Sequence, residues 1–264
     1  MILSALLGML VGLVLGVTGA GGGILAVPAL VFGMGWTMQQ SAPVALIAVA
    51  AGAAAGAAEG FRKRLVRYRA AALMALAALP LEVAGQRLAQ DLPQRGLLIL
   101  FAGVLLAVAL RLLRSREPYG ASGQSAALLA RVDEGSGRIR WTWPVGTLIA
   151  GIGAAAGLAT GMLGVGGGFV IVPMLRRFTT VTMHGIVATS LLVVAIVSGA
   201  GVAIALLRGN ALPGRETLWF AAATVAGMTL GRGLAGRLPA KYVQQGFAFL
   251  LIAVAIVLLV RVLR

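Results

Sequence analysis

Long charge-poor stretches alternate with short charged ones along most of this chain. Residues 1–58 carry no charged side chain, and neither do residues 144–175. The stretches cover 2–33, 41–60, 70–86, 96–113, 144–175, 183–207, 217–235 and 242–260. Since about 20 apolar residues cross a bilayer as one helix, the pattern predicts an all-α integral membrane protein with eight hydrophobic units.

The polar stretch between the fourth and fifth units divides the chain into similar halves. GAGGGILAVPAL (residues 19–30) and GVGGGFVIVPML (residues 164–175) lie 145 positions apart and agree at seven of twelve positions. The same offset pairs the glycines at 8, 12 and 16 with those at 153, 157 and 161. We therefore predict two tandem repeats of four units: a first membrane repeat over 1–114, a cytoplasmic linker over 115–143 and a second membrane repeat over 144–264.

Composition supports the membrane class and excludes several others. The chain is 60% hydrophobic and 11% charged, and its mean hydropathy is +0.99. A net charge of +15 would suggest nucleic acid in a soluble chain, but these basic residues lie in short loops, so we expect no nucleic-acid partner. Cysteine is absent, which excludes disulfides, thiol catalysis and Cys-ligated metal. No metal-ligand or Ser/His/Asp motif occurs either, so we expect neither an enzyme nor a bound cofactor.

Loop charges orient the predicted helices but leave one choice open. Positive loops are usually cytoplasmic, which places the basic cluster at residues 62–69 and the linker on that side. If units one and five each cross once, the 22 basic residues divide 15 inside to 7 outside, and the repeats are parallel. If both units enter and return, the division is 16 to 6, and the repeats are inverted. The rule does not separate these alternatives.

A glycine cluster followed by Val-Pro occurs in the first unit of each half. Three consecutive glycines and a proline disfavour a continuous helix, so units one and five are predicted to be broken or re-entrant. The free N–H groups at the start of the second half-helix favour an anion. Two such ends near the midplane would form a substrate site, and close helix packing is the alternative. The candidate residues are Gly21, Gly22, Gly23, Pro28, Gly166, Gly167, Gly168 and Pro173.

A few polar side chains within apolar units are further candidates, because such residues are costly in a bilayer and often functional. His184, the only histidine, is followed by Thr189 and Ser190, and Gln39 is its counterpart in the first half. We expect these side chains to face the substrate cavity, with interfacial or helix-internal roles as the alternative. Glu82 would relay a proton or pair with Arg87, and His184 is the second candidate for proton coupling. Glu59 is expected to be an interfacial ion-pair partner.

The duplicated G-x-G-G-G-x-x-x-V-P-x-L pattern resembles that of the sulfite exporter TauE/SafE family over essentially the whole chain. Its first copy matches at Gly19, Gly21 to Gly23, Pro28 and Leu30, and its second at Gly164, Gly166 to Gly168, Pro173 and Leu175. Ala188-Thr189-Ser190-Leu191 looks like the family segment that follows the second copy. The first half has Ala42-Pro43-Val44-Ala45-Leu46 there, so hydroxyl contacts would come from one repeat only.

The resemblance implies secondary transport, by export or uptake, of a small anion such as sulfite, sulfoacetate or another organosulfur anion, and we expect export. It also implies a multi-pass protein of a bacterial inner membrane that works by alternating access. The partners expected are the small anion and the lipid bilayer, and a homodimer is left open. The alternatives are a non-transporting partner in membrane-complex assembly and, far behind, a membrane enzyme.

Overall fold

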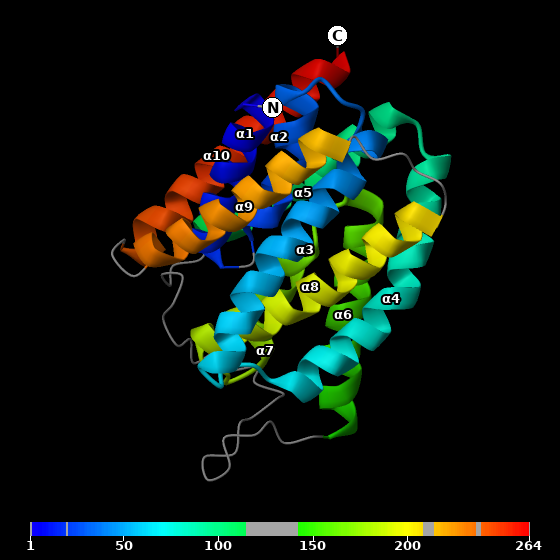
Figure 1. Ribbon diagram of the computed structural model, residues 1–264. Helices are drawn as coiled ribbons and strands as arrows, with labels where there is room; N and C mark the ends of the chain where they lie inside the picture. Colours follow the sequence, from blue (N-terminus) through cyan, green and yellow to red (C-terminus); the bar gives the residue numbers. More distant parts are fainter. Residues whose placement is uncertain (1, 20, 115–141, 208–213, 236–238, 264) are drawn as a thin grey trace.

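The computed structural model describes residues 2–19, 21–114, 142–207, 214–235 and 239–263, so nearly all of the predicted linker 115–143 lies outside it (Figure 1). Ten α-helices and one short 3-10 helix occupy the described ranges. The first half holds α1 (Ile2–Thr18), η1 (Gly22–Leu25), α2 (Ala26–Gly33), α3 (Met38–Arg62), α4 (Tyr68–Asp91) and α5 (Gln94–Arg114). The second half holds α6 (Trp143–Leu163), α7 (Gly168–Phe178), α8 (Met183–Leu207), α9 (Gly214–Ala235) and α10 (Ala240–Leu263).

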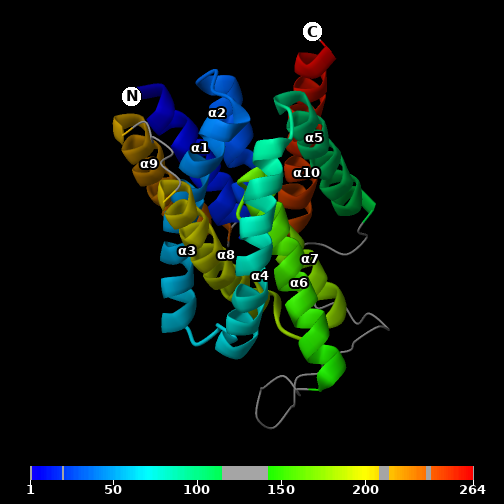
Figure 2. The ribbon, with the colours of Figure 1, turned by 90° about the vertical axis from the view of Figure 1, so that its right-hand side faces the viewer.

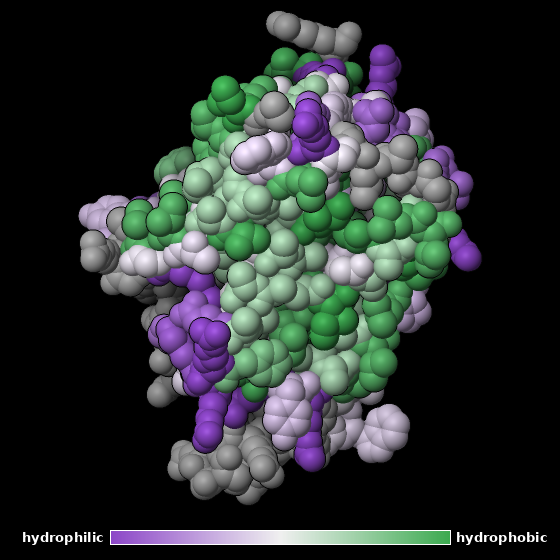
Figure 3. Space-filling model, in the orientation of Figure 1, coloured by the Kyte–Doolittle hydropathy of each residue, from purple (hydrophilic) through white to green (hydrophobic). Residues whose placement is uncertain are grey.

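Six helices among the described residues are long and apolar enough to cross a bilayer: α3, α4, α5, α6, α8 and α10. Figure 3 shows a broad apolar region across one face of the molecule, with polar side chains gathered mainly toward its edges and two ends. A surface of this kind suits hydrocarbon. The protein is therefore an all-helical, multi-pass membrane protein, as the charge-poor stretches predict.

Two helical hairpins enter the bundle from opposite ends. In Figures 1 and 2, α1 descends from the upper end and α2 returns toward it, while α6 rises from the lower end and α7 returns downward. Each reversal uses glycine at positive φ, namely Gly19 at +86° in the first hairpin and Gly164, Gly166 and Gly167 at +65° to +76° in the second. Side chains with a Cβ rarely adopt this conformation, so the glycines allow the chain to turn back.

The two halves interlock through small residues. Helix α1 packs along α9 and α6 along α4, while α3 pairs with α8 and α5 with α10. A methyl group added to Gly12 would overlap the carbonyl oxygen of Thr224, and one added to Gly157 would overlap that of Ala78. Backbones this close require glycine. The spaced glycines of α1 and α6 thus allow these helices to pack closely against their neighbours.

Helix α3 begins at Met38, three residues before the charge-poor stretch that predicts it. Thr37 and Gln40 form a reciprocal capping box, in which Gln40 N donates to Thr37 Oγ1 at 3.3 Å and Thr37 N donates to Gln40 Oε1 at 3.2 Å. Capping satisfies backbone donors that would otherwise lack partners. It thereby places Gln39 in the first turn of α3.

Candidate functional site

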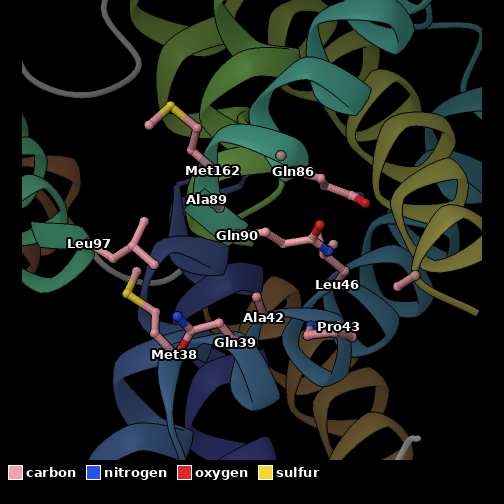
Figure 4. A pocket seen from close by; sticks show the side chains of 12 residues that line it. Met38, Gln39, Ala42, Pro43, Leu46, Gln86, Ala89, Gln90, Leu97 and Met162 are labelled. Carbon is pink, nitrogen blue, oxygen red and sulfur yellow. The ribbon is translucent and has the colours of Figure 1, made fainter. Parts of the chain in front are cut away.

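A pocket with an empty volume of about 530 Å³, which includes the space open to the outside, lies at the upper end of α3, α4 and α8 (Figure 4). Gln39 reaches it from the start of α3, and Gln86 and Gln90 reach it from the end of α4. Its other lining residues are apolar, and none of the described residues lining it is charged. The polar groups of this pocket are therefore three neutral carboxamides.

Gln86 and Gln90 stand one turn apart on α4, so both extend from the same side of the helix (Figure 4). Gln86 Nε2 donates to the carbonyl oxygen of Gly201 on α8 at 3.2 Å. The second N–H of the Gln86 amide and the side-chain amide of Gln90 take no part in this hydrogen bond. The pocket thus offers N–H donors without a fixed positive charge.

Glu82 lies one turn below Gln86 and is fully buried, with 0% of its surface exposed. Neither carboxyl oxygen has a hydrogen-bond partner among the described residues, so the expected pairing with Arg87 is not formed. A methyl group added to Gly201 would overlap Glu82 Oε1 and would lie 3.2 Å from Gln86 Nε2 and 3.0 Å from Leu46 Cδ1. Leu46 and Gln86 line the pocket, so the carboxyl group lies beside Gly201 next to two of the side chains that line it.

The opposite end of the molecule has a similar contact with different chemistry. Arg232 Nη1 on α9 donates to the carbonyl oxygen of Gly56 on α3 at 3.0 Å and pairs with Glu59 Oε2 at 2.5 Å. Glu59 also pairs with Lys63 at 2.6 Å. Glu59 is therefore an ion-pair partner near a helix end, the role expected for it.

The two glycine clusters are buried and touch each other. The Cβ position of Gly23 lies 3.1 Å from the carbonyl oxygen of Val165, next to the second cluster, and that of Gly167 lies 2.7 Å from the carbonyl oxygen of Ala156. At Gly22 a methyl group would overlap the backbone of Leu15. None of the candidate glycines, Gly21, Gly22, Gly23, Gly166, Gly167 and Gly168, lines the pocket. In this conformation the clusters are close-packed against neighbouring backbone.

The candidate prolines lie in the returning helices. Pro28 is buried in the first turn of α2, where the missing N–H costs no helical hydrogen bond. Pro173 lies inside α7, and its carbonyl oxygen accepts from Arg111 Nη2 of α5 at 3.5 Å. On the other side, Arg261 Nη1 of α10 donates to Val31 O of α2 at 2.9 Å. An arginine from the last helix of each half thus contacts a returning helix.

The structure separates Gln39 from the other polar candidates. Gln39 begins α3 at the upper end, whereas exposed His184 begins α8 at the lower end (Figure 1). Thr189 Oγ1 donates to Gly185 O at 2.7 Å and accepts from Arg67 N at 3.0 Å. Ser190 Oγ is buried and has no partner among the described residues. These candidates therefore do not share one cavity with Gln39 in this conformation.

Gln86 and Gln90 are the lining residues that inspection of the sequence missed. Together with Glu82 they recur every four residues, which places all three on one face of a helix. This spacing is a detectable signal, because an otherwise apolar helix face has little reason to carry three polar side chains. The signal is weak because Gln86 is the last residue of the charge-poor stretch 70–86 and Gln90 lies beyond it.

Comparisons with known proteins agree with the membrane architecture. A model of the family described as "Sulfite exporter TauE/SafE" matches residues 4–258. Two proteins named "Probable membrane transporter protein", from Xylella fastidiosa strain 9a5c and from strain Temecula1 / ATCC 700964, are each 29% identical over 252 residues. In both cases the match covers 94% of this chain and 91% of the relative. No solved structure matches.

Proposed function

Since the chain belongs to the sulfite exporter TauE/SafE family, a family of transporters rather than enzymes, we propose that this multi-pass membrane transporter carries a small anion across a bacterial inner membrane. The substrate class is an organosulfur or related anion such as sulfite or sulfoacetate, and transport proceeds by alternating access. Export is the direction that the family description favours. The lipid bilayer and one small substrate are then its essential partners.

The pocket of Gln39, Gln86 and Gln90 is the observation that carries the proposal. Carboxamide N–H groups bind an anion by hydrogen bonds, and apolar walls strengthen such bonds by excluding water. No described lining residue is acidic, so nothing in the lining would repel an anion. Neutral donors also bind less tightly than arginine does, which suits a transporter because it must release its substrate.

Two contacts support inverted repeats with a cytoplasmic lower end. Arg232 pairs with Glu59, beside the basic cluster at residues 62–69, and this contact requires the end of α9 to share a side with that cluster. Arg111 contacts α7, so the return of the second hairpin lies beside the last part of α5. This topology corresponds to the division of basic residues 16 to 6. The pocket then opens toward the opposite, outer side.

In the proposed cycle the glycine clusters act as the moving contact between the halves. Inverted repeats exchange conformations as one half rocks against the other. The clusters meet where Gly23 approaches Val165, so rocking would shift this contact and free the N–H groups at the start of α2 and α7 for the anion. His184, Thr189 and Ser190 then belong to the cytoplasmic half of the path, as Gln39 belongs to the outer half.

Flux measurements in proteoliposomes test this proposal. We expect saturable flux of radiolabelled sulfite or sulfoacetate in the wild type. In Gln39→Leu/Gln90→Leu the KM should rise about a hundredfold or more, since two hydrogen bonds to a charged group are lost and each is worth roughly 1.5 kcal/mol or more net of exchange with water. Gln245→Leu is the matched control, because Gln245 is exposed on α10 away from the pocket. Saturable flux with the same KM in the pocket variant and the control would exclude the pocket as the anion site.

A further inference from the structure

On the basis of the proposed anion transport, we propose that the Glu82 carboxyl group binds the proton that crosses the membrane together with the anion. Glu82 would accept one proton at a carboxyl oxygen while the pocket is accessible and release the same proton after the halves have rocked. The carboxyl group returns to its starting state in each cycle. Proton and anion would move in the same direction.

The first support is the isolation of this carboxyl group. It has no surface exposure, and neither oxygen has a hydrogen-bond partner among the described residues. Helix α6 carries no charged residue, and the only titratable side chain of α8 is His184 at the far end. On α3 the charged residues are Glu59 and Arg62, again at the far end, and on α4 they are Arg69, Arg87 and Asp91, all exposed. A buried carboxylate without a counter-charge is unfavourable, so a bound proton is the simplest way to neutralise it.

The second support comes from comparing Glu82 with Met228, which occupies a similar position at the other end of the molecule. Gly161 packs against the backbone of Glu82 as Gly16 packs against that of Met228. The Glu82 carboxyl group fills the space beside Gly201, and the end of the Met228 side chain fills the space beside Gly56. A methionine side chain therefore fills the equivalent space at the other end of the molecule. Packing does not require an acid at position 82, so the acid needs another explanation.

The third support is proximity to the pocket. The carboxyl group, Leu46 and Gln86 all lie beside Gly201, and Leu46 and Gln86 line the space where the anion would bind. An anion there repels a carboxylate and is compatible with a neutral carboxyl group, so each ligand strengthens binding of the other. This reciprocity favours simultaneous binding of the proton and the anion, which is the condition for transporting both in the same direction.

Infrared titration of the reconstituted protein tests the proton site without reference to any substrate. We expect a carboxylic acid C=O band in the wild type that disappears in Glu82→Gln and persists in Asp91→Asn, an acid on the same helix that is exposed. Glu82→Met is the second variant, because Met228 shows that this side chain fits the equivalent space. Absence of a Glu82 band at every pH at which the protein stays folded would overturn the proposal.

A second test measures the flux of radiolabelled sulfoacetate in proteoliposomes, with a pH dye inside them to follow proton movement. An imposed pH gradient should stimulate anion flux in the wild type and in Asp91→Asn, and this stimulation should be lost completely in Glu82→Gln and Glu82→Met. Gradient-stimulated flux that survives in both Glu82 variants would overturn coupling while anion transport stands. A Glu82 band in a protein that moves no anion would refute the proposed function and leave the proton site in place.

Discussion

The two ends of this transporter hold a helix against a glycine carbonyl with different side chains. At the upper end Gln86 donates to Gly201 O, beside a buried carboxyl group and an open pocket. At the lower end Arg232 donates to Gly56 O and also pairs with Glu59, whose second partner is Lys63. A side chain donates to a glycine carbonyl group in both places, but only the donor at the lower end is charged and ion-paired.

In the proposed alternating-access cycle, this difference would make the upper end easier to open than the lower end. A single amide hydrogen bond contributes about 1 kcal/mol net and holds α4 against α8 only weakly. The lower end adds an ion pair in which 23% of the Arg232 side chain and 42% of the Glu59 side chain are exposed, so solvent weakens it without abolishing it. The conformation with an open upper pocket therefore fits a lower end held by charge.

Substitution of the closely packed glycines in α1 and α6 should have the largest effect, and it tests whether the two interfaces are equivalent. Gly12→Ala would press on the carbonyl group of Thr224 and Gly157→Ala on that of Ala78, and overpacking of this kind costs about 1–3 kcal/mol. We expect a similar loss of thermal stability in detergent for both variants, measured by circular dichroism. Gly151→Ala is the control, because nothing lies within 4 Å of its added methyl group. A large loss at one site alone would show that the two interfaces are not equivalent.

Giving the upper end a charge like that of the lower end should slow transport about tenfold. In Gln86→Arg the guanidinium group would pair with Glu82, one turn away on α4, and so be held on the carbonyl oxygen of Gly201 of α8. A charged donor there, worth about 1.4 kcal/mol more than an amide, corresponds to a factor of ten in the population in which α4 and α8 stay together. The measurement is anion flux in proteoliposomes at saturating substrate. Adding Glu82→Gln removes the new partner and should restore exchange flux. Slow flux in the double variant would mean that arginine blocks the pocket by bulk rather than by pairing.

Making the lower end resemble the upper one should have the smallest effect. Arg232→Gln can still donate to Gly56 O but cannot pair with Glu59, and the loss of about 1 kcal/mol opens this end about fivefold more often. The chain has no cysteine, so Val187→Cys near the lower end of α8 gives a clean reporter for maleimide labelling. Labelling should be about fivefold faster with Arg232→Gln than with the control Arg69→Gln, whose side chain is exposed. Equal rates would show that the ion pair does not hold this end.

Much of the helical layout was predictable from the order of apolar and charged residues. Each charge-poor stretch corresponds to one helix or one hairpin, because hydrocarbon requires apolar side chains and satisfied backbone groups. The ends were less predictable. Helix α3 starts earlier than its apolar stretch because Thr37 and Gln40 cap it, and α4 runs on to Asp91 through two glutamines that line the pocket.

The candidate site was predicted less well than the helices. Gln39 lines the pocket as expected, whereas the glycine clusters are packed against backbone and His184 lies at the other end. Glycine permits both a binding turn and a close contact, so its presence does not distinguish them. Their part in binding remains a prediction about another conformation of the transporter.

The sequence by itself determined that this chain lies in a membrane, where its helices fall and how its polar residues are spaced along them. Only the tertiary structure decided that α1 packs on α9 and α6 on α4, that the hairpins enter from opposite ends, and that Glu82 lies unpaired beside a pocket of glutamines. The reason is physical. Transfer into hydrocarbon depends on each segment alone, whereas a contact such as Arg232 with Glu59 joins residues 173 positions apart and depends on how the helices pack.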